Sequence, residues 1–202
     1  MAKLITVGPK NCFFRSKLQS RSRCASRSDS SLTQSALLVA VPEAEPLVST
    51  WRLKLDPVAA RGVPAHITVL FPFLEPSEID DDTVATLHEL VSAHRRFNFD
   101  CVAVEFFDTD VMWLRPEPAR GFLALTAAIF RAFPNYAPYG GSFEEPQPHL
   151  TVGQGGSFSR LKVAAEELAP QLPLRAEAIE LLLMVGGPAP VSWTVRNRFI
   201  LP

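Results

Sequence analysis

Two short segments of the chain carry the same pattern of chemically active side chains. One reads HITV and begins at His66, and the other reads HLTV and begins at His149. In each segment a threonine follows the histidine by two positions, as Thr68 and Thr151. Residues two apart in a β-strand project from the same face. Each segment, folded as a strand, therefore presents an imidazole and a hydroxyl side by side.

A pair of histidines suits displacement at phosphorus. Imidazole has an unperturbed pKa near 6.5, so near neutral pH one ring can accept a proton while the other donates one. The attacking oxygen loses a proton and the leaving oxygen gains one, and threonine hydroxyls can donate hydrogen bonds to the phosphate oxygens. A zinc site needs at least three protein ligands, whereas each segment offers one. We therefore expect neither a metal ion nor another cofactor.

The spacing of the two segments favours a shared function. The histidines are 83 residues apart, which is half the length of the stretch from Leu37 to Pro202. A duplicated unit with one motif in each half gives this spacing, although the halves share no extended identity. A single His-x-Thr is more often an ordinary half-buried strand, because short motifs arise by chance. Two copies at half-chain spacing favour the catalytic interpretation.

The paired motifs resemble those of the two-histidine (2H) phosphoesterase superfamily. This superfamily includes the 2′-5′ RNA ligase and RNA 2′,3′-cyclic phosphodiesterase proteins of bacteria and archaea, and plant-type cyclic nucleotide phosphodiesterases. The segments HITVLFPF and PHLTVG match its two motifs, and the resemblance covers most of residues 36–202. It implies a bilobal, pseudo-symmetric α+β fold. Each lobe is a small antiparallel sheet with helices outside, and both motif strands line a central cleft.

The resemblance also implies a role for each motif residue. His66 and His149 are the catalytic residues, and Thr68 and Thr151 bind the phosphate. For opening a 2′,3′-cyclic phosphate we assign His149 as the base that activates water and His66 as the acid, with the roles exchanged in the reverse direction. The expected activity is that of a metal-independent cyclic phosphodiesterase or a reversible 2′-5′ RNA ligase-like enzyme. Its substrate would be a 2′,3′-cyclic or 2′-5′ phosphodiester of an RNA end or a small nucleotide.

Two alternatives remain open. The chain could be a catalytically silent module that binds a nucleotide or phosphate with the same fold, or a structural protein in which the motifs are incidental. Other side chains have weaker claims to function. Tyr139, in a loop rich in proline and glycine, is a candidate for stacking on a nucleobase. His88 and His94 are predicted to be exposed helix residues, and three arginines could steer a phosphate or serve as surface charge: Arg115, Arg196 and Arg198.

The elements that must position these residues follow from hydrophobic periodicity. β-rich or alternating runs predict strands over 36–41, 65–71, 97–107, 111–115, 149–152, 178–185 and 192–201. Apolar stripes at helical spacing predict helices over 46–55, 81–93, 122–133 and 159–168. The stretch 153–156 (GQGG) lacks the Lys-Ser/Thr of a nucleoside triphosphate loop, so it predicts a turn. The sum is an α+β domain over residues 36–202.

The net charge of −1 is an average over two unlike parts. Residues 1–35 have a balance of +6 and are rich in serine and arginine, whereas residues 36–202 have a balance of −7. The tail has three interpretations: an organelle transit peptide, a disordered extension without a targeting signal, or an artefact of start-site choice with the true start near Leu32. We expect a cytoplasmic protein, or an organellar one if the tail is a transit peptide.

Composition narrows the class of protein further. With 47% hydrophobic residues the body can bury a core, and no apolar stretch approaches the roughly 18 residues of a membrane span. An acidic body disfavours binding of long nucleic acid, so we expect a small nucleotide or an RNA terminus as the partner. The three scattered cysteines indicate a reducing compartment rather than a disulfide framework. We expect a monomer.

Overall fold

The computed structural model of the protein describes residues 34–141 and 146–202, apart from the side chain of Tyr139. The tail at 1–35 lies almost wholly outside the described residues, so its three interpretations stay predictions. No described helix is long and apolar enough to cross a membrane.

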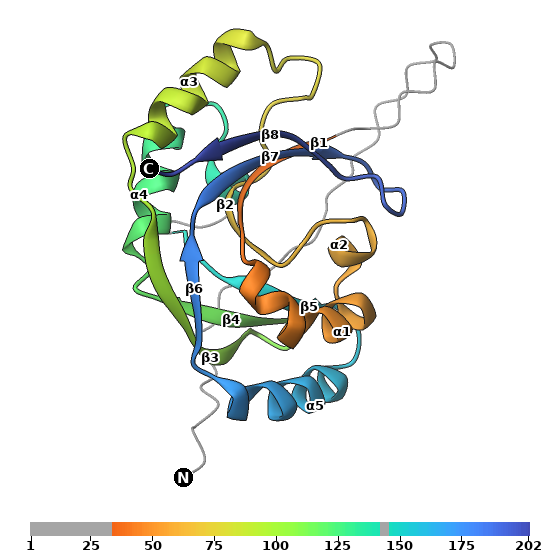
Figure 1. Cartoon of the computed structure of the whole chain (residues 1–202). Coiled ribbons are helices and arrows are strands. Elements are labelled where there is room, and N and C mark those ends of the chain that lie inside the picture. The colour runs from red at the N-terminus through yellow and green to blue at the C-terminus, as the bar shows by residue number, and fades with distance from the viewer. Residues whose placement is uncertain (1–33, 142–145) are drawn as a thin grey trace, which may run out of the picture.

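Within the described residues, eight strands form two antiparallel sheets of four strands each (Figure 1). The first sheet has the order β2 (His66–Leu70), β1 (Gln34–Ala40), β7 (Glu180–Gly186), β8 (Thr194–Ile200). The second has the order β5 (Leu150–Gln154), β4 (Val111–Glu117), β3 (Phe97–Phe107), β6 (Leu174–Ala178). The predicted α+β class with two antiparallel sheets is confirmed.

Helices cover the outer side of both sheets (Figure 1). The α-helices are α1 (Glu45–Leu55), α2 (Pro57–Ala60), α3 (Asp81–Ser92), α4 (Arg120–Ala132) and α5 (Phe158–Leu168), and the short 3₁₀ helices are η1 (Pro42–Ala44), η2 (Pro138–Gly141) and η3 (Ala169–Gln171). Helices α3 and α4 pack on β8 and β2 of the first sheet, while α1 and α5 pack on β5 and β4 of the second. Buried side chains from both sheets and from these helices join in one main core.

The two halves of the chain have the same order of elements. The first half runs β1-α1-β2-α3-β3 with the short helix α2 added, and the second runs β4-α4-β5-α5-β7 with the strands β6 and β8 added. In each half the first two strands pair with each other, and the last strand joins the sheet of the other half. The strands β2 and β5, which carry the motifs, therefore occupy equivalent edge positions. This is the arrangement that the half-chain spacing of the histidines predicts.

Local sequence explains where the elements begin and how closely they pack. Helix α3 begins after Asp80, whose carboxylate accepts a hydrogen bond from the backbone N–H of Thr83 at 2.8 Å. Beyond the second motif, a Cβ on Gly153 would lie 2.8 Å from the Leu161 side chain and 2.9 Å from Leu55. Glycine at this position therefore lets α1 and α5 approach β5. Gly155 has a positive φ of 74°, as a turn there requires.

The strand predicted over 178–185 is present as β7, but the strand before it, β6, was not predicted. The structure has two strands there, β6 ending at Ala178 and β7 beginning at Glu180. Between them Ile179 marks the point at which the chain leaves the second sheet for the first, since β6 pairs with β3 and β7 pairs with β1. Arg175 and Glu177 make β6 look polar in the sequence, so its strand character was missed.

Candidate active site

The two His-x-Thr segments meet in space. They lie at the edge strands β2 and β5, and these strands are in contact although they belong to different sheets. The intervening apolar residues face the core and are at most 1% exposed: Ile67, Val69, Leu150 and Val152. The histidines and threonines between them are only partly buried. The predicted alternation of faces is confirmed.

Both imidazole rings are held in the same way. Nδ1 of His66 lies 2.7 Å from the carbonyl oxygen of Pro64, and Nδ1 of His149 lies 2.7 Å from that of Gln147. Because a carbonyl oxygen can only accept, each neutral ring carries its proton on Nδ1. Nε2 is therefore the ring nitrogen that carries no proton in each neutral imidazole.

Aromatic side chains pack around His149. The ring of Phe107 meets the imidazole edge to face, with centroids 5.0 Å apart, and that of Trp113 does so at 5.8 Å. Phe107 and Trp113 are themselves stacked at 4.7 Å. Trp113 lies on β4 directly opposite Thr151 of β5. The second motif therefore has an aromatic wall on one side.

Burial disfavours the charged form of both histidines. It lowers the pKa of His66 to about 4, and the positive charges of Arg52 and His149 lower it too, against the opposing effect of the Pro64 carbonyl. Burial also lowers the pKa of His149, again partly offset by its bond to Gln147. The two imidazoles thus lie close enough for the charge of one to act on the other. Because both pKa values lie below 6.5, the neutral form of each ring predominates at pH 7.

The lowered pKa of His66 should make the fold sensitive to acid. Between pH 6.5 and about 4 His66 is protonated in the unfolded chain but remains neutral in the folded chain. The free energy of unfolding should therefore fall as the pH drops through this window, by about 3 kcal/mol from this residue. Urea unfolding of the native chain and of His66→Asn at several pH values measures the difference. The raised pKa of Asp56 acts in the opposite direction but is common to both proteins. Identical pH dependence in the two proteins would rule out a His66 that is held neutral by the fold.

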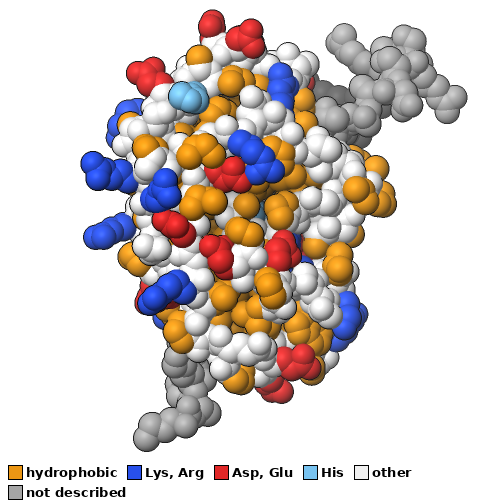
Figure 2. Space-filling view, viewed as in Figure 1, with side chains coloured by type: hydrophobic (Ala, Val, Ile, Leu, Met, Phe, Trp, Pro, Cys, Tyr) orange, Lys and Arg blue, Asp and Glu red, His pale blue; other side chains and the backbone are white. Residues whose placement is uncertain are grey.

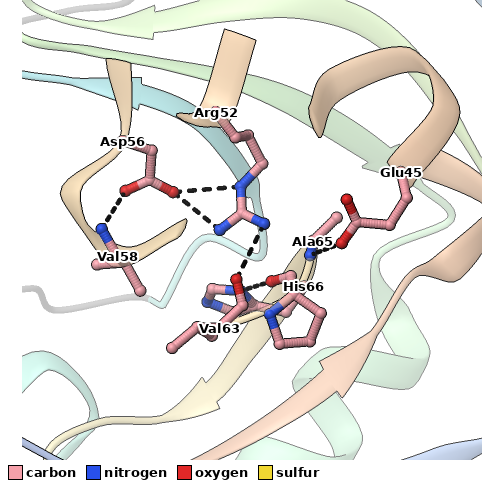
Figure 3. A network of polar contacts seen from close by, with 8 residues as sticks. Glu45, Arg52, Asp56, Val58, Val63, Ala65 and His66 are labelled. Atoms are coloured by element: carbon pink, nitrogen blue, oxygen red, sulfur yellow. Dashed lines mark hydrogen bonds and ion pairs between the residues drawn. The ribbon is translucent and has the colours of Figure 1, made fainter. Parts of the chain in front are cut away.

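A buried ion pair supports the segment before the first motif (Figure 3). Arg52 of α1 is 2% exposed and donates to Oδ2 of Asp56 from Nη2 at 2.9 Å and from Nε at 3.2 Å. Its Nη1 donates to the carbonyl oxygen of Val63 at 3.3 Å. Asp56 in turn accepts from the backbone N–H of Val58, which caps α2. The pair thus ties α1 to the chain that leads into His66.

A second contact from α1 holds the residue next to the catalytic candidate. Glu45 accepts a hydrogen bond from the backbone N–H of Ala65 at 2.6 Å, as Figure 3 shows. The carbonyl oxygen of Pro64, between the two tethered residues, orients the His66 ring. Arg52, Asp56 and Glu45 therefore position His66, and none of the three was singled out from the sequence. The i,i+4 spacing of Arg52 and Asp56 was the one available signal.

The three candidate arginines are all engaged by the protein. Arg115 lies on the same face as Thr151 and Trp113, and its Nη1 is 3.1 Å from Glu105. Arg198, on the face of the first sheet that carries Thr68, pairs with Glu180. Arg196 donates instead to two carbonyl oxygens in the loop before α3: those of Pro76 and Ile79. The cationic charge beside the motifs is thus offset by carboxylates.

The remaining candidates lie apart from the motifs or outside the description. His88 is exposed on α3, as predicted, and His94 is partly buried just after it, with Nδ1 2.8 Å from the Leu90 carbonyl oxygen. The side chain of Tyr139 is outside the described residues, so its stacking role stays a prediction. Within residues 34–141 and 146–202, no cluster of three or more His, Cys, Asp or Glu side chains could hold a metal ion.

Comparison with known proteins identifies the family. The sequence profile of the 2′-5′ RNA ligase superfamily matches residues 40–188, which is most of the chain. The chain belongs to the 2′-5′ RNA ligase superfamily. The matched region of this superfamily member contains both His-x-Thr motifs and the elements that support them. No curated protein sequence matches it.

Solved structures of other proteins share the fold of this superfamily member. TT0787 of Thermus thermophilus superposes with a TM-score of 0.59 at 20% identity, over 83% of this chain and 97% of that one. E. coli LigT complexed with 3′-AMP gives 0.52 at 18% identity, over 84% and 98% of the two chains. LigT complexed with NADP+ gives 0.53 at 18% identity, over 85% and 99%. At these identities the likeness shows the fold alone.

Proposed function

We propose that this member of the superfamily is a metal-independent phosphodiesterase that opens a 2′,3′-cyclic phosphate by paired-histidine catalysis. The reverse direction would join ends through a 2′-5′ bond. One observation carries the proposal. Two partly buried imidazoles with the same tautomer, each beside a threonine, lie on adjoining edge strands. Such a pair can take one proton and give another at a single phosphorus atom.

The protons balance in a simple sequence of events. Nε2 of His149 accepts a proton from a water molecule as the water oxygen bonds to phosphorus. The bond from phosphorus to one ribose oxygen breaks, and protonated His66 gives that oxygen its proton. Since burial lowers the pKa of His66, the negative charge of the bound phosphate must supply the favourable interaction that protonates it. The hydroxyls of Thr68 and Thr151 donate to the non-bridging oxygens.

The distribution of charge favours a small substrate. Acidic side chains lie among basic ones across the centre of the face seen in Figure 2, and further Lys and Arg lie along its left edge. The arginines on the motif faces, Arg115 and Arg198, are paired with carboxylates. Long RNA binds through many unpaired cations. A small nucleotide or the end of an RNA, held by one phosphate, is therefore the proposed substrate. LigT, with the same fold, has been solved with 3′-AMP.

The proposal also covers assembly and location. Both motif strands come from one chain, so the site needs no second copy and the protein is expected to act as a monomer. Cys101 is a free thiol buried in the core, as in proteins of a reducing compartment such as the cytoplasm.

A substrate panel tests the proposed function. Purified protein in buffer with EDTA is incubated with each of the 2′,3′-cyclic nucleotides and with short 2′-5′-linked oligoribonucleotides. Ring opening of at least one cyclic nucleotide is the expected result. Binding of a cyclic nucleotide without turnover would instead identify a catalytically silent module. If the protein neither bound nor turned over any of these compounds, the motifs would be incidental.

A further inference from the structure

In the part of the chain that the structure describes, the indole N–H of Trp113 has no hydrogen-bond acceptor. The side chain is 1% exposed, and among the described residues no acceptor lies within hydrogen-bonding distance of Nε1. Arg115 Nε is also without a hydrogen bond, but it lies 3.3 Å from the Glu117 carboxylate in an ion pair. Trp113 therefore carries an unpaired polar group inside the fold.

Such a group needs an explanation, because burying a donor without a partner costs about 1–3 kcal/mol. The other two tryptophans of the chain obey the usual rule. Trp51 Nε1 donates to Glu167 at 3.2 Å, and Trp193 Nε1 donates to the carbonyl oxygen of Gly187 at 3.1 Å. The exception thus occurs at the tryptophan that lies beside the second motif.

Trp113 lies beside both functional residues of the second motif. Directly opposed residues on neighbouring antiparallel strands have Cβ atoms roughly 5 Å apart, and Trp113 is opposed to Thr151. Its ring also contacts that of His149, and stacking on Phe107 fixes its plane. Thr151 and His149 are partly exposed, whereas the indole is buried, so a ligand held by these two residues would lie next to the indole ring.

We propose that Trp113 is a substrate-binding residue whose indole N–H donates to a non-bridging oxygen of the phosphate. This inference rests on the proposed function, in which Thr151 and His149 face that same phosphate. A neutral donor fits the site well, since the nearby Arg115 is already paired with Glu105 and Glu117. The bond formed in the complex would satisfy the donor that the ligand-free protein leaves unpaired.

Indole proton resonances test the contact without any turnover. The ¹H–¹⁵N spectrum of the full chain contains three indole signals, and the variant Trp113→Phe assigns one of them by its loss. Titration with inorganic phosphate should move the Trp113 signal downfield and leave those of Trp51 and Trp193 in place, because these two are already bonded. Adenosine, which has no phosphate, should not produce the downfield shift. A Trp113 signal that ignores phosphate while backbone signals of the motifs move would overturn the proposal.

Activity and stability together separate binding from a structural role. Trp113→Phe keeps an aromatic ring and removes the donor, so kcat/KM for 2′,3′-cyclic AMP should fall about 10- to 100-fold. The thermal midpoint should stay level or rise, since an unpaired buried donor has been removed. Trp51→Phe is the matched control, with turnover within about twofold of native. Unchanged turnover with a lowered midpoint in Trp113→Phe would show a structural role only. If the native chain turned over no nucleotide, the proposed function would fail, and the phosphate titration would still decide the Trp113 contact.

Discussion

Replacing either motif histidine should leave only a small fraction of the native turnover. His66→Ala and His149→Ala are each expected to lower kcat/KM for 2′,3′-cyclic AMP by about 100- to 10,000-fold, the range for loss of a general acid or base. The aromatic side chains that pack on the His149 ring, Phe107 and Trp113, have no group that could take over its proton transfer. Initial rates in buffer with EDTA measure the loss.

Two controls keep this result interpretable. His88→Ala removes an exposed histidine on α3 and should leave the rate unchanged. Asparagine at either motif position can still donate to the carbonyl oxygen that now accepts from Nδ1, but it lacks Nε2. His66→Asn and His149→Asn should therefore fold like the native chain and be as inactive as the alanine variants. A motif variant that folds normally and keeps more than about a tenth of the native rate would contradict the assigned roles.

Arg52→Met should be the most damaging change to stability. It leaves the carboxylate of Asp56 buried without its partner, and breaking a buried ion pair in this way costs about 3–5 kcal/mol. Burial raises the pKa of Asp56 even in the presence of Arg52, so this carboxylate is already poorly stabilised. Urea unfolding should show the loss, together with a thermal midpoint about 10 °C lower.

A double variant distinguishes stabilisation from positioning. Arg52→Met with Asp56→Asn removes both charges, and the Asn oxygen can still cap α2 through Val58. Its free energy of unfolding should return to within about 1 kcal/mol of native. The tether to Val63 is still missing, so the double variant should turn over substrate more slowly than the native chain despite its recovered stability. A single Arg52→Met variant as stable as the native chain would refute the buried pair.

Local patterns were enough to predict the elements that carry the motifs. The strands β2 and β5 have a period of two in apolar residues, which fixes the face of each histidine independently of the rest of the fold. The half-chain spacing of His66 and His149 also predicted their equivalent positions. Strand β6 was not predicted because its pairing with β3 is long-range. Its charged residues Arg175 and Glu177 also give it a polar sequence that is not typical of a strand.

The support for the site was less visible in the sequence. Arg52 and Asp56 have the spacing of an ordinary surface pair on a helix, and nothing local reveals that both are buried. The meeting of Trp113 and Thr151 depends on the register between β4 and β5, which includes an irregularity between Met112 and Trp113. Such registers are decided by packing across the whole sheet, so the contact cannot be deduced from either strand alone.

The pH dependence of kcat/KM in the presence of EDTA tests the paired histidines most directly. The native chain would be assayed with 2′,3′-cyclic AMP from about pH 4 to about pH 9. This parameter reports the ionisation of the free enzyme, and burial lowers the pKa of both histidines below 6.5. The expected profile is a bell with its maximum below pH 6.5, which falls on the acid side as the base is protonated and on the alkaline side as the acid is deprotonated. A rate abolished by EDTA, or one that does not change with pH over this range, would contradict acid–base catalysis by His66 and His149.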